Sequence, residues 1–317
     1  MSLFGRCLLL VCLFVSPLVR AEEPSRRDLL KQSKRIVFLG DSITFAGRYV
    51  ACVDAWIESQ RFDHKPLVID AGLPSETVSG LSEDGHAGGA FPRPDLAERL
   101  DRVLAVTKPD LVVACYGINC GIYLPFDAGR FEKYQQGITN LKARVEKAGA
   151  KFIVVTPPFY DDMRSPKNFT YNEVMDKYAE WLVSKRADGW MVADAHTAMT
   201  NEVRQRREAD PKFTFQPDGV HPNDEGHWCV AQQLIRWFGD EAAASAATPQ
   251  AMLALKQVPE SVFPLVNQRV AVLRDANVAT AGHKRPGVGA GLPLPEAEAK
   301  AKELSAKIDA LVRPARQ

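Results

Sequence analysis

Apolar and polar positions alternate along residues 35–238 in short and long segments. Short apolar runs rich in β-branched residues predict five strands, at residues 35–39, 66–70, 111–115, 152–156 and 190–193. Longer amphipathic stretches predict helices at about residues 44–59, 94–106, 131–148, 172–186 and 224–238. This alternation predicts a doubly wound, flavodoxin-like α/β fold, in which a five-stranded parallel sheet lies between two layers of helices.

The pattern changes after about residue 239. An alanine-rich linker precedes three further segments: an amphipathic stretch at 260–276, a segment rich in glycine and proline at 282–295, and a predicted helix at 296–312. The apolar stripe of that last helix is thin, with Leu304, Ile308 and Leu311 at helical spacing. We therefore expect a main domain over residues 22–239 and a helical extension, residues 240–317, that docks on it.

The first 21 residues have the three parts of an export signal. Arg6 supplies a positive start, an apolar run of about 12 residues follows, and residues 19–21 resemble a cleavage site. A membrane anchor would need about 20 apolar residues. We expect cleavage after Ala21 and export to the periplasm or the extracellular space.

Composition and charge narrow the classes of partner. The chain is 46% hydrophobic and 25% charged, as in ordinary globular proteins. Loss of residues 1–21 would remove two arginines and no acidic residue, which changes the formal net charge from +1 to −1. A nearly neutral surface gives no electrostatic reason to expect nucleic acid or acidic lipid as a partner.

Four cysteines would remain after cleavage: Cys52, Cys115, Cys120 and Cys229. They are widely spaced and form no Cys-x-x-Cys metal signature. Exported proteins can form disulfides, so disulfides and buried free thiols are both open, and the connectivity cannot be read from the sequence.

A serine follows the first predicted strand. Residues 38–44 read Phe-Leu-Gly-Asp-Ser-Ile-Thr, which places Ser42 at the carboxyl end of the strand and the start of a helix. Ligands of doubly wound sheets bind at this edge, and a helix N-terminus favours a developing negative charge. The alternative is that Asp41 or Ser42 simply caps the helix.

Asp218 and His221 stand in one short loop before the last predicted helix of the main domain. A serine hydroxyl becomes an effective nucleophile when a base removes its proton, and an imidazole does this best when a carboxylate fixes its tautomer. Alone, this loop could equally be a turn with a solvated histidine. Together with a serine at a strand end, it indicates nucleophilic catalysis.

Two further segments can supply hydrogen-bond donors. Asn119 follows the third predicted strand, and its amide can donate to an oxyanion, a contact worth about 3–4 kcal/mol of barrier. Residues 70–77 follow the second strand and can aim a backbone N–H inward. The alternatives are that Asn119 is simply a turn residue and that residues 70–77 are an ordinary loop. Residues 82–94 form a long loop that either lines the cleft or lies on the surface.

Together these segments resemble the SGNH/GDSL hydrolases. The resemblance covers about residues 35–238 and rests on three blocks, Gly-Asp-Ser-Ile at 40–43, Gly-Ile-Asn at 117–119 and Asp-Gly-Val-His at 218–221. It implies that Ser42 is the nucleophile, His221 the general base and Asp218 the carboxylate that orients the base. It also implies that Asn119 donates to the oxyanion.

Two departures from the family pattern bear on activity. Ser75 stands where the family usually has glycine. The donor there is a backbone N–H, which Ser75 can still supply, but its side chain narrows the pocket. The family often follows its asparagine with aspartate, whereas Cys120 follows Asn119 here. The loss of that carboxylate predicts a less firmly oriented amide and reduced activity.

The residues and the resemblance predict a serine esterase that uses an acyl-enzyme and needs no cofactor or metal ion. A near-neutral, exported chain without a long apolar lid favours short acyl groups, such as acetyl, on glycans. Lysophospholipid or thioester hydrolysis is the alternative within the enzyme class, and a glycan-binding relative without turnover is the alternative outside it. A two-metal phosphoesterase would find too few ligands in Asp41, Asp218 and His221. The oligomeric state is open.

Overall fold

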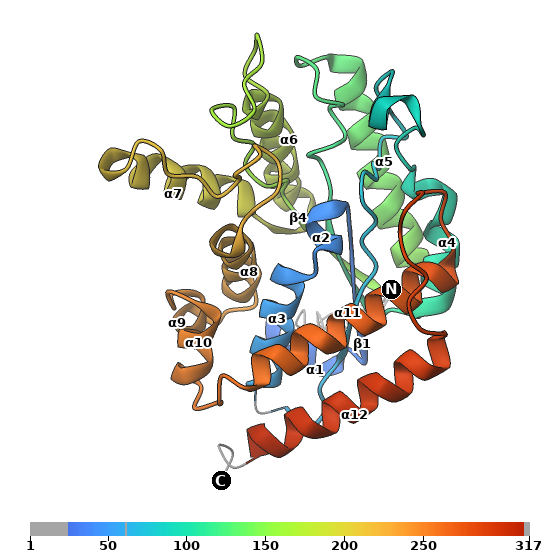
Figure 1. The fold of residues 1–317 in the computed structure, drawn as a ribbon, viewed down its shortest axis with the longest axis vertical. Helices are drawn as coiled ribbons and strands as arrows, with labels where there is room; N and C mark the ends of the chain where they lie inside the picture. Colours follow the sequence, from blue (N-terminus) through green and yellow to red (C-terminus); the bar gives the residue numbers. More distant parts are fainter. Residues whose placement is uncertain (1–24, 61, 314–317) are drawn as a thin grey trace, which may run out of the picture.

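The computed structural model describes residues 25–60 and 62–313. Its sheet has five strands, β1 (Arg35–Gly40), β2 (Leu67–Asp70), β3 (Leu111–Cys115), β4 (Lys151–Val155) and β5 (Met191–Ala193). They lie in the order β2-β1-β3-β4-β5, and all neighbouring strands are parallel, as in flavodoxin-like sheets. The predicted fold class is confirmed (Figure 1). The predicted signal peptide lies outside the described residues.

Helices cover both faces of the sheet. Side chains of β1 alternate between two cores: Ile36 and Phe38 face one, and Val37 and Leu39 face the other. The first core contains residues of α1 (Arg26–Gln32), α3 (Arg48–Glu58), α7 (Ala195–Ala209) and α8 (Asp224–Trp237). The second contains residues of α4 (Leu96–Thr107), α5 (Ala128–Lys147) and α6 (Asn172–Ser184). The main part of the chain is therefore a three-layer α/β/α sandwich.

The predicted helix at 44–59 is two helices. A short helix, α2 (Ser42–Phe45), precedes α3, and Gly47 between them has a φ of 74°. Glycine adopts this left-handed conformation without a Cβ clash, so the chain can turn sharply there. The turn separates Ser42, at the end of β1, from α3, which packs on the sheet.

Helix α7 was not predicted. It buries only four side chains, Ala195, His196, Met199 and Val203, and the rest of its length is largely polar. Its apolar stripe is thus too thin to give a clear periodic signal. Short helical turns, η1 (His86–Gly89) and η2 (Lys185–Asp188), lie in the connections.

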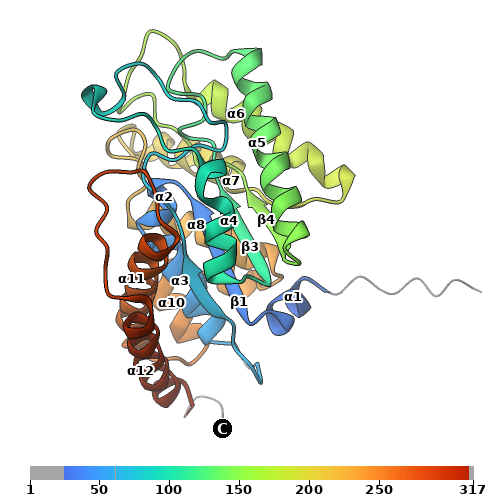
Figure 2. The same cartoon turned by 90° about the vertical axis from the view of Figure 1, so that its right-hand side faces the viewer.

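The C-terminal residues form α9 (Glu241–Ala244), α10 (Pro249–Leu255), α11 (Val262–Ala281) and α12 (Leu294–Val312). Helix α11 contacts α3, β2 and α4, and α12 packs on α11. Figure 2 shows α11 and α12 together along one side of the molecule, beside α3. The division of the chain into domains at residue 239 stays a prediction.

A buried ion-pair cluster joins α11 to the main part of the chain. The guanidinium of Arg269 donates to Asp54 and Glu58 of α3 at 2.8–2.9 Å, and to Ser305 of α12 at 2.8 Å. Such a cluster is destabilising to break, because it leaves an unpaired buried charge. Helix α11 is therefore firmly attached to α3.

Two further observations concern the described residues. Their four cysteines are all buried and unpaired. Of the two alternatives left open by the sequence, disulfides and buried free thiols, the structure therefore has buried free thiols. None of the described helices has the length and apolar character that a membrane span requires.

Candidate active site

The structure brings together three of the predicted site residues at the carboxyl edge of the sheet. The Oγ atom of Ser42 lies 2.9 Å from Nε2 of His221, and Nδ1 of His221 lies 2.7 Å from Oδ2 of Asp218. Because a carboxylate only accepts, Nδ1 of His221 donates to Asp218, which leaves Nε2 on the side of the Ser42 hydroxyl. A hydroxyl, an imidazole and a carboxylate thus form one hydrogen-bonded line.

Ser42 is positioned by the end of β1 and by its neighbour Asp41. At Gly40 a Cβ atom would lie 1.9 Å from Oγ1 of Thr44, so only glycine fits before the turn. The buried Asp41 carboxylate accepts from the N–H of Ile43 at 2.9 Å and caps α2. Burial raises the pKa of Asp41 to about 6. The capping interpretation therefore applies to Asp41, and it leaves the Ser42 hydroxyl available to His221.

The loop of Asp218 and His221 is held by its own hydrogen bonds. Oδ1 of Asp218 accepts from the backbone N–H groups of Val220 at 2.9 Å and His221 at 2.7 Å. Partial burial acts to raise the pKa of Asp218, but the hydrogen bonds from His221 and Val220 outweigh it and lower the pKa. Asp218 is therefore a stable carboxylate that can hold the imidazole ring in place.

This loop is also open to solvent. The side chains of Asp218 and His221 are 56% and 52% exposed, and Ser42 is half-buried. Gly219 has a φ of 88°, and a Cβ there would lie 2.5 Å from Ser165. A glycine thus lets the loop turn against its neighbour while the side chains of Asp218 and His221 face solvent.

Ser75 lies in a loop packed directly on the turn of Ser42. The N–H of Leu73 donates to the carbonyl of Gly40 at 2.8 Å, and a Cβ at Gly72 would lie 2.5 Å from the backbone N of Phe45. Ser75 itself has a φ of 67°. This left-handed conformation costs a non-glycine residue about 1–2 kcal/mol, which gives a physical reason for the glycine usual at this position.

Asn119 is held by partners that the sequence analysis did not identify. The hydroxyl of Tyr123 donates to Oδ1 of Asn119 at 2.9 Å, and Nδ2 of Asn119 donates to the carbonyl of Glu76 at 3.3 Å. Tyr123 therefore orients this amide although Cys120 follows it, and the reduced activity expected from Cys120 stays a prediction. The Nδ2 group has a second hydrogen, which can be donated to a bound oxyanion.

A buried charged network lies beneath residues 70–77 and the segment that carries Asn119. Arg99 of α4 donates to both carboxylate oxygens of Glu76, at 2.6 and 2.7 Å, and the hydroxyl of Tyr116 donates to the same carboxylate at 2.6 Å. Arg99 also donates to the carbonyl of Ala71 at 2.8 Å. Burial raises the pKa of Glu76, against the opposing effect of Arg99. The network ties residues 70–77 to the segment that carries Asn119.

The loop at residues 82–94 reaches the same region through Arg93. Its guanidinium donates to the Glu83 carboxylate at 2.6 Å and to the carbonyl of Ser75 at 3.4 Å, and it lies 5.1 Å from the centre of the Tyr123 ring. His86 of this loop instead faces Glu83, at 3.1 Å. Arg93 is thus a further residue that supports the segment of Ser75.

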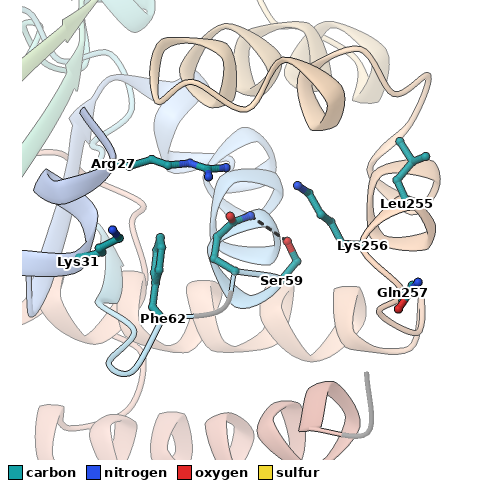
Figure 3. Close-up of a pocket in the computed structure, with 8 residues that line it drawn as sticks. Arg27, Lys31, Ser59, Phe62, Leu255, Lys256 and Gln257 are labelled. Atoms are coloured by element: carbon teal, nitrogen blue, oxygen red, sulfur yellow. Dashed lines mark hydrogen bonds between the residues drawn. The ribbon is translucent and has the colours of Figure 1, made fainter. Parts of the chain in front are cut away.

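A separate cavity lies at the opposite end of the sheet. It has a volume of about 470 Å³ and is lined by basic, neutral polar and apolar side chains, among them Arg27, Lys31, Ser59, Phe62 and Lys256 (Figure 3). Helix α1 precedes β1, so its residues lie at the amino end of the strands. The cavity is therefore remote from Ser42 and His221.

Comparison with known proteins agrees with this geometry. A family model described as the GDSL-like Lipase/Acylhydrolase family matches residues 38–229. The chain therefore belongs to this family, and the resemblance drawn from its sequence blocks is confirmed. Membership makes the protein a hydrolase that acts on ester bonds.

Solved structures share the fold at low sequence identity. A catalytic mutant of Axe2, an acetylxylan esterase from Geobacillus stearothermophilus, is 23% identical with a TM-score of 0.50, over 66% of this chain and 95% of that one. LAE5, an α/β hydrolase from the metagenome of Lake Arreo, has the same identity and TM-score over 65% and 95%.

A gut microbial diltiazem-metabolizing enzyme, BT4096, is 21% identical with a TM-score of 0.54, over 65% of this chain and 47% of that one. The matched region thus spans about half the length of that enzyme. The search of curated proteins finds no match.

Proposed function

We propose that the protein is a serine carboxylic-ester hydrolase in which Ser42 is the nucleophile, His221 the general base and Asp218 its orienting carboxylate. One observation carries the proposal: Ser42 Oγ, His221 and Asp218 form a hydrogen-bonded line with distances of 2.9 and 2.7 Å. These distances are within the 2.6–3.2 Å that proton transfer between nucleophile and base requires.

The reaction would proceed in two acyl transfers. Ser42 Oγ attacks the ester carbonyl while His221 Nε2 takes its proton, and His221 then protonates the departing alcohol oxygen. Water attacks the resulting acyl-enzyme by the same route, which releases the acid and restores the Ser42 hydroxyl. Asp218 stabilises the imidazolium that forms in each step.

The negative charge that develops on the attacked carbonyl oxygen needs hydrogen-bond donors to stabilise it. We assign these to the backbone N–H groups of Ser42 and Ser75 and to Nδ2 of Asn119. The support is the packing of the Ser75 loop on α2 and the hydrogen bond that links Asn119 to Glu76, the residue after Ser75. Each such donor is worth about 3–4 kcal/mol of barrier.

For the substrate we propose short acyl groups, such as acetyl, on glycans. The exposure of His221 and Asp218 supports this, because an open edge accepts an ester that projects from a large polar molecule. The acetylxylan esterase among the structural relatives is consistent with it. Export by residues 1–21 belongs to the same proposal, since an exported enzyme meets extracellular glycans.

One observation favours a second candidate, the hydrolysis of longer acyl chains. Large apolar side chains are exposed on loops at the carboxyl edge: Leu124 and Phe126 at 41% each after β3, and Met163 at 62% after β4. Isolated apolar side chains are common on surfaces, so this is weaker support than the open polar site.

Two measurements test the proposal. The rates of hydrolysis of nitrophenyl acetate and nitrophenyl dodecanoate separate short from long acyl preference, and acetate release from a panel of acetylated glycans identifies the carrier. We expect faster turnover of the acetyl ester, acetate release from at least one glycan, and loss of both in Ser42→Ala. A preference for the dodecanoate would favour the second candidate, and unchanged hydrolysis in Ser42→Ala would reject Ser42 as nucleophile.

A further inference from the structure

Helix α11 reaches the turn that carries Ser42. Nη1 of Arg274 donates to the carbonyl oxygen of Phe45 at 2.7 Å, and the guanidinium carbon lies 4.3 Å from the centre of the Phe45 ring. Phe45 is the last residue of α2, which begins at Ser42. Figures 1 and 2 show α11 passing beside α2. A residue 232 positions beyond Ser42 thus contacts the same helical turn.

Such a short helix depends on contacts from outside. Helix α2 has four residues, and the last carbonyl groups of a helix have no partner within it. One turn is not stable by itself, because its ordering cost exceeds the gain from its few hydrogen bonds. A cation at the C-terminus also interacts favourably with the helix dipole. Arg274 supplies both a donor and a positive charge at the end of α2.

The same guanidinium lies near a buried acid at the end of β2. Asp70 is fully buried; its Oδ1 accepts from the N–H of Gly72 at 2.8 Å, and its Oδ2 has no hydrogen-bond partner among the described residues. Nη1 of Arg274 and Oδ2 of Asp70 both lie within 4 Å of the position that a Cβ of Gly47 would occupy. Arg274, which also pairs with the carboxylate of Asp275 at 2.8 Å, therefore lies near Asp70, the first residue of the segment 70–77 that carries Ser75.

We infer that Arg274 is a positioning residue for ester hydrolysis, and that the C-terminal helices complete the active site by holding the turn of Ser42. The inference rests on the proposed role of Ser42. Arg274 acts through Phe45 and Asp70 and does not touch the substrate. Its loss would let the Ser42 hydroxyl move relative to His221, and small displacements from attack geometry cost up to about a hundredfold in rate.

Other contacts keep α11 docked without Arg274. Arg269 is buried against Asp54 and Glu58, and Arg102 of α4 donates to the carbonyl of Ala281 at 2.7 Å. Arg102 is a matched control, because it also joins α11 to the main part of the chain but contacts Ala281, at the C-terminal end of α11, and not Phe45 of α2. If Arg274 only attached α11 to the main part of the chain, Arg102→Met and Arg274→Met would lower activity equally.

The experiment compares full-length wild type, Arg274→Met, Arg274→Lys and Arg102→Met. The readouts are kcat and KM for nitrophenyl acetate, the second-order rate of labelling by a fluorophosphonate, and the thermal unfolding midpoint. For Arg274→Met we expect kcat and the labelling rate to fall together by about tenfold to a hundredfold, with KM within about twofold of wild type. Arg102→Met should keep wild-type kcat.

Lysine at position 274 can donate to Phe45 but cannot stack on its ring in the same way, so we expect Arg274→Lys to lie between Arg274→Met and wild type. Wild-type kcat in a folded Arg274→Met, or an equal loss in Arg102→Met, would overturn the inference. If Arg274→Met does not fold, wild-type kcat in Arg274→Lys overturns it. Failure of the proposed function is distinct: it would appear as a wild type without Ser42-dependent hydrolysis.

Discussion

The buried ion pair of Glu76 and Arg99 links residues 70–77 to α4. Its contribution to the free energy of unfolding can be tested by substitution. Glu76→Gln keeps the shape of the side chain but removes its charge. Three donors point at the carboxylate, two from Arg99 and one from Tyr116, at 2.6–2.7 Å. An amide offers only one oxygen to them, so at least one donor would face an NH₂ group and Arg99 would be a buried charge without a counter-ion.

Removing one partner of a buried ion pair costs about 3–5 kcal/mol. Both side chains here are essentially inaccessible, with Glu76 0% and Arg99 1% exposed, so solvent does not screen the pair. We therefore expect Glu76→Gln to lower the free energy of unfolding by about 3 kcal/mol or more. The hydrolysis rate should fall as well, because the carbonyl of Glu76 accepts from the Asn119 amide.

Urea unfolding at pH 7.5 measures this effect, as a lower midpoint with an unchanged slope. Glu146→Gln is the matched control, since Glu146 pairs with Lys142 on the exposed surface of α5 in an i,i+4 arrangement worth at most about 0.5 kcal/mol. A loss below about 1 kcal/mol in Glu76→Gln, or one equal to that of Glu146→Gln, would refute the reasoning.

Two further perturbations follow from the charges near the site. Burial raises the pKa of Asp70 from 3.8 to about 7, so between these values the folded state binds a proton that the unfolded state has lost. Stability should therefore fall as the pH rises from about 4 to 7, by up to about 4 kcal/mol, and Asp70→Asn should flatten this fall in thermal scans; an unchanged slope would contradict the assignment. Asp218→Asn should lower kcat/KM by about 10⁴-fold with little change in unfolding midpoint, and activity within tenfold of wild type would remove Asp218 from its orienting role.

The strands could be predicted because their signal is local. Each of the five observed strands begins and ends within one residue of its prediction, since short apolar runs between polar turns mark buried parallel strands. The break between α2 and α3 was missed, because it depends on a left-handed Gly47 within an otherwise helical pattern. Helix α7 was missed because few of its side chains are buried.

The candidate site residues could be proposed from short motifs, one after the first strand and one before α8, and the residues that support them could not. Ser42, Asp218 and His221 are adjacent to turns with distinctive neighbours, and the structure places them in contact. Arg99 and Arg274 lie in helices where arginine is ordinarily a solvated residue. Their contacts span 23 and 229 positions in the chain, so no local pattern indicates them.

The most direct test of the account is to identify the residue that an active-site-directed fluorophosphonate modifies. The protein would be labelled, digested and mapped by mass spectrometry, with Ser42→Ala in parallel. The account predicts a single adduct on the peptide that contains Ser42 and none on the variant. An adduct on another residue, or equal labelling of Ser42→Ala, would contradict the hydrogen-bonded line of Ser42, His221 and Asp218 as the catalytic centre.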